Sequence, residues 1–222
     1  MSDERLNDTW QQFDYFPSSV YILEKPEFLE SVKKVSDSYL KVAQKEQKKL
    51  NELYPVRMTA NYYDDPAIED FRNYVLATSW NILNSQGYAM NMFNTQFTEM
   101  WTQEHFKHSA MSQHVHGYGS QIIAFYFLDC PKDCSRVVFH DPRAGKVIND
   151  LPEAQVELAT SASRMINFEP KPGLLMFTNA YVAHEFTRHG STKPIRFIHM
   201  NITVGQAQSF CQAPAEIIWV TF

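Results

Sequence analysis

The segment HVHGYGSQIIAFYFL, residues 114–128, joins two histidines spaced two residues apart to a long apolar run. Residues i and i+2 of a β-strand point to the same face of the sheet, and a short apolar run bounded by turn residues is typical of a buried strand. If the strand extends back over His114, the imidazoles of His114 and His116 project side by side. The segment therefore predicts a β-domain with paired histidines on one strand.

A third histidine, His184, follows a second apolar strand pattern at residues 173–177 and the turn after it. Two ligands from one strand and a third from a distant strand are a common way for a β-barrel to build a mononuclear metal site with open coordination positions. We therefore predict that His114, His116 and His184 are catalytic metal ligands. Of the other histidines, His140 and His199 fall within or at the end of predicted strands and suit core positions or positions that support the ligands.

The apolar spacing changes along the chain from helical to extended. An extended segment at residues 19–23 precedes two predicted helices, at about 26–53 and 65–87, each with a proline in its first turn. Strands are expected near residues 95–106, 113–117, 120–129, 135–140, 164–168, 173–178, 181–188, 195–204 and 216–222. This order predicts an α+β fold, a double-stranded β-helix (jelly roll) with two N-terminal helices packed on one side.

We expect a single domain over residues 1–222, with 1–88 as an N-terminal helical support and 89–222 as the jelly-roll core. The polar segment 142–163 is interpreted as a loop over the barrel mouth, or as a short helix at Glu153–Leu158. The apolar segment 217–220 suits a buried strand or a dimer edge, and the pattern leaves the oligomeric state open.

The composition limits the classes of partner. The chain is 44% hydrophobic and carries a net charge of −5 without a dense lysine and arginine face, which argues against a nucleic-acid partner. The polar N-terminus lacks a signal-sequence core and no apolar run is long enough to span a bilayer, so we expect a cytoplasmic protein without a membrane partner. The three cysteines are interpreted as free thiols.

Arg196 begins the last long apolar strand pattern, at residues 195–202. A guanidinium buried among apolar neighbours is costly without an anionic partner. A small dicarboxylate lying between the metal and Arg196 would supply that partner. In the alternative interpretation, Arg196 reaches the rim of the barrel or pairs with Glu185 or Asp141.

Four segments in this order and spacing resemble the iron(II)- and 2-oxoglutarate-dependent oxygenases, in the branch near the prolyl 4-hydroxylases and close to a group of small microbial and phage oxygenases. The segments are residues 16–21, 100–128, 139–143 and 172–201. In this superfamily the iron ligands are usually a His-x-Asp/Glu pair and a distal histidine. An arginine or lysine further along binds the far carboxylate of 2-oxoglutarate. The resemblance assigns that role to Arg196, twelve residues after His184 (196 − 184 = 12).

The chain departs from the family pattern at the ligand pair, where His116 takes the usual carboxylate position. Three histidine ligands would leave more net positive charge on the iron than a 2-His-1-carboxylate site does. Alternatively, Asp141 supplies an oxygen ligand and one of the paired histidines only supports the site. A second departure is Phe127, where relatives often have a tyrosine that contacts the cosubstrate. Tyr126 should point to the opposite face, and we assign a cosubstrate contact to Gln103 instead.

The resemblance implies an enzyme that uses iron(II), 2-oxoglutarate and dioxygen to hydroxylate an unidentified small-molecule or peptidyl substrate. 2-Oxoglutarate would chelate the iron through its 2-oxo acid end and leave as succinate and carbon dioxide. Two alternatives remain open. One is a cupin-like three-histidine metal dioxygenase that does not use 2-oxoglutarate, which His116 favours and Arg196 disfavours. The other is a non-catalytic β-sandwich that binds a ligand or another protein.

Overall fold

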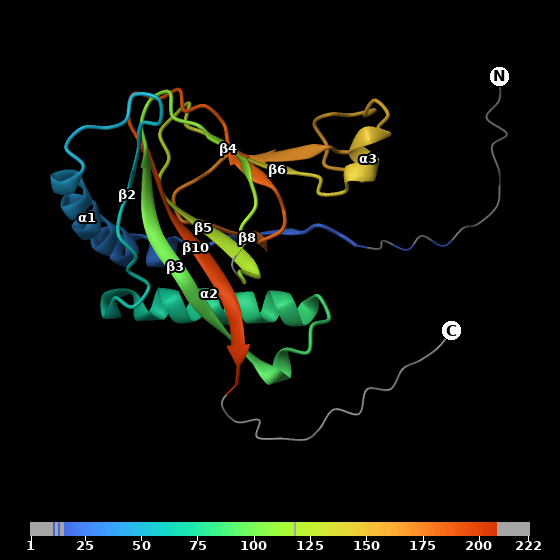
Figure 1. Ribbon diagram of the computed structural model, residues 1–222, viewed down its shortest axis with the longest axis horizontal. Coiled ribbons are helices and arrows are strands. Elements are labelled where there is room, and N and C mark those ends of the chain that lie inside the picture. Colours follow the sequence, from blue (N-terminus) through green and yellow to red (C-terminus); the bar gives the residue numbers. More distant parts are fainter. Residues whose placement is uncertain (1–10, 12, 14–15, 118, 208–222) are drawn as a thin grey trace.

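The computed structural model describes residues 11, 13, 16–117 and 119–207, and its strands form two antiparallel sheets (Figure 1). The large sheet has six strands in the order β1 (Val20–Glu24), β8 (Leu174–Asn179), β5 (Ile122–Asp129), β10 (Ile195–Gln206), β3 (Phe93–His105) and β2 (Val56–Met58). The small sheet has four strands in the order β4 (Met111–His114), β9 (His184–Phe186), β6 (Val137–His140) and β7 (Met165–Phe168).

From β3 to β10 the chain crosses repeatedly between the two sheets. β3, β5, β8 and β10 belong to the large sheet, whereas β4, β6, β7 and β9 belong to the small one. Such repeated crossing folds the chain into the double-stranded β-helix, so the predicted jelly roll is confirmed. The predicted strands between residues 95 and 204 all form, with ends shifted by a few residues. The expected strand at 216–222, and the apolar segment 217–220 within it, lie outside the described residues.

The two predicted N-terminal helices are α1 (Leu29–Glu46) and α2 (Glu69–Ser85), each preceded by a 3-10 turn that begins at a proline, Pro26–Phe28 and Pro66–Ile68. Both helices pack on the large sheet (Figure 1). α1 ends earlier than predicted because no residue from 44 to 55 is buried, and short helical turns without packing are unstable. No helix of the described part of the chain is long and apolar enough to cross a membrane.

The large sheet is buried on both faces, and alternate residues of its strands enter different cores. On β5, Ala124 and Tyr126 face the helices, whereas Phe125 and Phe127 face the small sheet. The Tyr126 hydroxyl donates a hydrogen bond to the carbonyl of Lys25, 2.6 Å away on the helical side. Tyr126 therefore points away from the barrel interior, as predicted. This alternation follows from the two-residue period of a strand.

The N-terminal part is not helical throughout. Its strands β1 and β2 extend the large sheet at its two edges, so residues 1–88 and 89–222 share one sheet. The helix expected at Glu153–Leu158 is absent from the described residues. A short helix, α3 (Ala144–Ile148), forms earlier in the same segment and lies at the tip of the β6–β7 connection (Figure 1).

The buried carboxylate of Glu104 links three strands and a helix on the helical side of the large sheet. Glu104 on β3 is 2% exposed and accepts hydrogen bonds from Arg57 Nη1 on β2 at 2.5 Å and from Arg196 Nε on β10 at 2.9 Å. Arg196 Nη1 also lies 3.4 Å from Asp37 Oδ1 on α1. Because a buried charge is costly unless it is paired, these contacts hold three strands and one helix in a fixed arrangement.

Replacing Glu104 with alanine should lower the free energy of unfolding by about 3 kcal/mol, because it leaves two guanidinium groups without their shared partner. Urea denaturation followed by circular dichroism measures this difference. The matched control is Glu52→Ala, which removes an exposed carboxylate paired with Lys49 and should change stability by less than about 0.5 kcal/mol. Equal effects of the two substitutions would contradict the role assigned to Glu104.

Candidate metal centre

The structure brings His114, His116 and His184 together at one end of the barrel. His114 ends β4, His116 lies just beyond it, and His184 begins β9 directly opposite His114. Each imidazole has one nitrogen that lies within 4.8 Å of a nitrogen of each of the other two imidazoles. Residues from distant parts of the sequence thus form one cluster because the jelly roll pairs β4 with β9.

Hydrogen bonds of the imidazoles leave nitrogen lone pairs pointing into the cluster. Nδ1 of His114 lies 2.8 Å from the Ser112 carbonyl, and Nδ1 of His184 lies 3.2 Å from the Val182 carbonyl. A carbonyl only accepts, so each Nδ1 carries the proton and Nε2 keeps its lone pair. This arrangement is typical of histidines that bind metals.

Two of these nitrogens are buried without a partner. Nε2 of His184 and Nε2 of His116 make no hydrogen bond within the described part of the chain. Burial lowers the pKa of His116 to about 4 and the pKa of His184 to about 3, with a smaller contribution from the neighbouring His114. Both rings are therefore neutral near pH 7, which is the form that binds a metal ion. The donor set fits a divalent iron, since imidazole is a good ligand for it.

His199 on β10 supports the cluster from the large sheet. Its ring stacks on His116 with the centroids 4.7 Å apart, and it is fully buried. Nε2 of His199 donates to Asn201 Oδ1 at 3.0 Å, and Nδ2 of Asn201 donates to Glu99 Oε2 at 2.5 Å. The sequence pattern left His199 as a core or supporting residue. The structure places it against a predicted ligand.

Asp141, the alternative oxygen ligand, is engaged elsewhere. Its carboxylate accepts from Nε and Nη2 of Arg143 at 2.9 and 2.8 Å and from the Arg143 backbone at 2.9 Å. It is not part of the histidine cluster. Two further pairs, Lys146 with Asp150 at 3.3 Å and Arg164 with Asp150, tie the rest of this segment together. Asp141 therefore belongs to the ion pairs that shape the β6–β7 connection.

Arg196 does not reach the histidines, and the contact with 2-oxoglutarate expected of it is not supported by its position. Its side chain lies on the helical side of β10 and is paired with Glu104, Asp37 and Asp129. Neither Glu185 nor Asp141, the partners expected in the alternative interpretation, pairs with it. Gln103, in contrast, faces the barrel interior on β3, where its Oε1 lies 2.8 Å from His105 Nε2.

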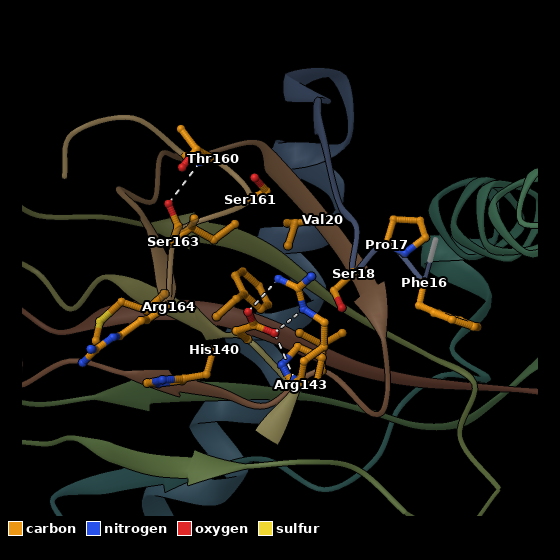
Figure 2. Close-up of a pocket in the computed structure, with 17 residues that line it drawn as sticks. Phe16, Pro17, Ser18, Val20, His140, Arg143, Thr160, Ser161, Ser163 and Arg164 are labelled. Atoms are coloured by element: carbon orange, nitrogen blue, oxygen red, sulfur yellow. Dashed lines mark hydrogen bonds and ion pairs between the residues drawn. The ribbon is translucent and has the colours of Figure 1, made fainter. Parts of the chain in front are cut away.

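A pocket of about 400 Å³ lies against the small sheet, and its lining includes neighbours of His184 but none of the three clustered histidines. Phe139, His140 and Val182 line it. Phe139 lies opposite His184 in the small sheet. His140 follows Phe139 in the sequence, and Val182 precedes His184 by two residues. Figure 2 shows the Arg143 side chain extending toward Ser18 and Val20, while the Arg164 side chain points away from them. The pocket is thus bounded by the N-terminal segment, the small sheet and the β6–β7 connection. Its volume is in the range of small-ligand sites.

Residues 99–198 match the model of a protein family described as "Putative 2OG-Fe(II) oxygenase". The match covers a little under half of the chain and makes it similar to the 2OG-Fe(II) oxygenases. The matched segment contains all three clustered histidines. The similarity and the histidine cluster together support an oxygenase that depends on iron(II) and 2-oxoglutarate and consumes dioxygen. No curated protein matches the sequence.

Solved structures with the same fold share little sequence with this oxygenase. A prolyl-4-hydroxylase from Pseudomonas putida is 10% identical, with a TM-score of 0.54, over 84% of this chain and 93% of that one. AviO1 from Streptomyces viridochromogenes Tue57 is 11% identical, with a TM-score of 0.55, over 89% and 93%. A prolyl hydroxylase from Trichoplax adhaerens is 12% identical, with a TM-score of 0.50, over 83% of both chains. These similarities establish the fold.

The metal-free protein should lose stability as the pH falls below about 6.5, the usual pKa of histidine in an unfolded chain. Burial lowers the pKa of His105 and of His184 to about 3 in the folded protein. Between pH 6.5 and pH 3, the approximate pKa values in the unfolded and the folded protein, the unfolded chain binds protons that the folded protein does not. The unfolding free energy should fall by about 1.4 kcal/mol per pH unit for each such histidine.

Urea denaturation of the metal-free protein near pH 7, 6 and 5 measures this slope. The variant His105→Phe should have a shallower slope than the parent protein. The variant His108→Asn, which changes an exposed histidine at a positive φ that asparagine tolerates, should leave the slope unchanged. A stability that is constant between these pH values would show that the buried histidines are not held neutral by the fold.

Proposed function

We propose that His114, His116 and His184 hold the iron of this oxygenase and that its reaction hydroxylates a C–H bond of an organic substrate. The observation that carries this proposal is the pair of buried Nε2 atoms, on His116 and His184, that converge without a hydrogen-bond partner in the described structure. Unpartnered buried nitrogens are rare in folded proteins because each costs about 1–3 kcal/mol. Coordination of a metal ion would remove that cost.

Iron(II) with 2-oxoglutarate supplies the oxidation: dioxygen converts 2-oxoglutarate to succinate and carbon dioxide, and the second oxygen atom enters the substrate C–H bond. The residues of the chain position and protect this chemistry. The carbonyls of Ser112 and Val182 fix the orientation of two imidazoles. The ring of Phe125 lies 5.4 Å from the ring of His184 and excludes water from the interior side of the cluster.

The pocket lined by Phe139 and Val182 is the proposed substrate site. Its walls include the apolar side chains of Val20, Phe139, Ile166 and Val182, and Arg143 contributes the cationic group that extends into it. A volume of about 400 Å³ accommodates a small molecule or one side chain of a polypeptide. Both substrate classes fit this space, and the apolar walls favour a substrate that presents an unactivated hydrocarbon group to the metal.

Anaerobic titration of the protein with iron(II), with and without 2-oxoglutarate, tests the proposal. A weak visible charge-transfer band is expected only when both are present, because it arises from the chelate of 2-oxoglutarate on iron. The variants His184→Ala and His114→Ala should lose this band and at least about 10-fold in iron affinity, because each removes one of three ligands.

His108→Asn is the matched control, since it removes a histidine outside the cluster and should keep the band. Circular dichroism of each variant establishes that the fold is retained. Succinate production by a folded His184→Ala variant at the parent rate would overturn the ligand assignment. Tight iron binding without the band would support the three-histidine dioxygenase that does not use 2-oxoglutarate.

A further inference from the structure

The interior of the barrel contains no strand arginine or lysine that could bind the far carboxylate of 2-oxoglutarate. Between β3 and β10, the strands as the structure bounds them include a single residue of either type, Arg196. Its guanidinium is held on the helical side by Glu104 and Asp37. A far carboxylate that entered the barrel would therefore need other donors.

The inward face of β3 presents a row of polar side chains: Trp101, Gln103 and His105. The indole Nε1–H of Trp101 is buried and has no hydrogen-bond partner among the described residues. Indole nitrogen can only donate. Nε2 of His105 lies 2.8 Å from Gln103 Oε1, and when it donates to that oxygen, the amide NH2 of Gln103 is left to donate elsewhere. An unpartnered buried donor is costly, which suggests that a ligand completes it.

This row begins beside the metal cluster and continues into the barrel. The ring of Trp101 lies 4.4 Å from the ring of His199, which in turn stacks on His116. Gln103 is the next inward residue of β3 and lies opposite Phe197 in the sheet. Two donors thus follow one another along the direction that leads from the histidines into the apolar interior.

The charges of the metal centre make a further cation unnecessary. Three neutral histidines leave both positive charges of iron(II) in place, and 2-oxoglutarate brings two negative charges, so that their complex is neutral. A site with one carboxylate ligand has one positive charge fewer and gains from a cationic partner at the far carboxylate. In this chain His116 takes the place of that carboxylate, and the far end of the cosubstrate requires hydrogen bonds rather than charge.

We propose that Trp101 Nε1 and the Gln103 amide donate hydrogen bonds to the far carboxylate of 2-oxoglutarate, and that His105 is a positioning residue that orients the Gln103 amide. The chain then binds a dianionic cosubstrate without an arginine. This proposal rests on the proposed function, because it requires the 2-oxo acid end to be chelated by iron held by the three histidines.

The test compares two ligands on the iron(II)-loaded protein under anaerobic conditions. 2-Oxopentanoate has the same chain length and 2-oxo acid end as 2-oxoglutarate, but a methyl group replaces the far carboxylate. The charge-transfer band reports chelation of either ligand, and its titration gives both dissociation constants. The ratio of the two constants isolates recognition of the far carboxylate from binding to the metal.

Trp101→Phe keeps an aromatic ring against His199 but removes the N–H group, and Gln103→Met keeps the side-chain length but removes the amide. Each variant should weaken 2-oxoglutarate by about 10- to 100-fold, because a hydrogen bond to a charged group is lost. Each should change the affinity for 2-oxopentanoate by less than about 3-fold. His105→Phe should lower the preference for 2-oxoglutarate in the same direction by leaving Gln103 free to rotate.

Arg196→Gln is the matched control and should keep the parent preference for 2-oxoglutarate. An unchanged preference in Trp101→Phe and Gln103→Met, or its loss in Arg196→Gln, would overturn the proposal. Equal weakening of both ligands would also overturn it, since the substitutions would then act on the metal end. If the parent protein shows no band with either ligand, the proposed function itself fails.

Discussion

Burial of the large sheet on both faces is the constraint on which the rest of the structure depends. Each strand delivers alternate side chains to two separate environments, the helical layer and the barrel interior. On β10, Arg196 and Met200 reach the helical side, whereas Phe197 and His199 reach the interior. The same strand therefore supplies an ion pair that stabilises the fold and a ring that supports the metal cluster.

The jelly roll and the clustering of the three histidines could be predicted because their signals are local. A His-x-His pair before an apolar run and a histidine after a second run place imidazoles at the ends of strands, whatever the details of packing. The position of Arg196 could not be predicted in the same way. A strand that is apolar on both faces gives no alternation to identify its inward side. Arg196 and His199 are three positions apart on one strand, so their side chains point to opposite faces and only one of them can face the interior.

The segment 142–163 was expected to be a loop or a short helix at Glu153–Leu158, and the structure has a loop there with its short helix elsewhere. Ion pairs within the β6–β7 connection accompany this conformation, such as Arg164 with Asp150 and Arg143 with Asp141. Local propensity favoured a helix at Glu153–Leu158, but the short helix forms at Ala144–Ile148, where Lys146 reaches both Asp141 and Asp150. Ion pairs of this kind leave no periodic signal in the sequence.

The ion pairs of Glu104 connect the barrel to the N-terminal part of the chain. Its partners lie on β2, which precedes the barrel in sequence, and on β10, which closes it, while Arg196 reaches onward to α1. Lys33 of α1 also pairs with Asp129 at the end of β5. Removal of residues 1–88 would expose these charged groups and one apolar face of the large sheet. We therefore expect the helical layer and the barrel to unfold as a single cooperative unit.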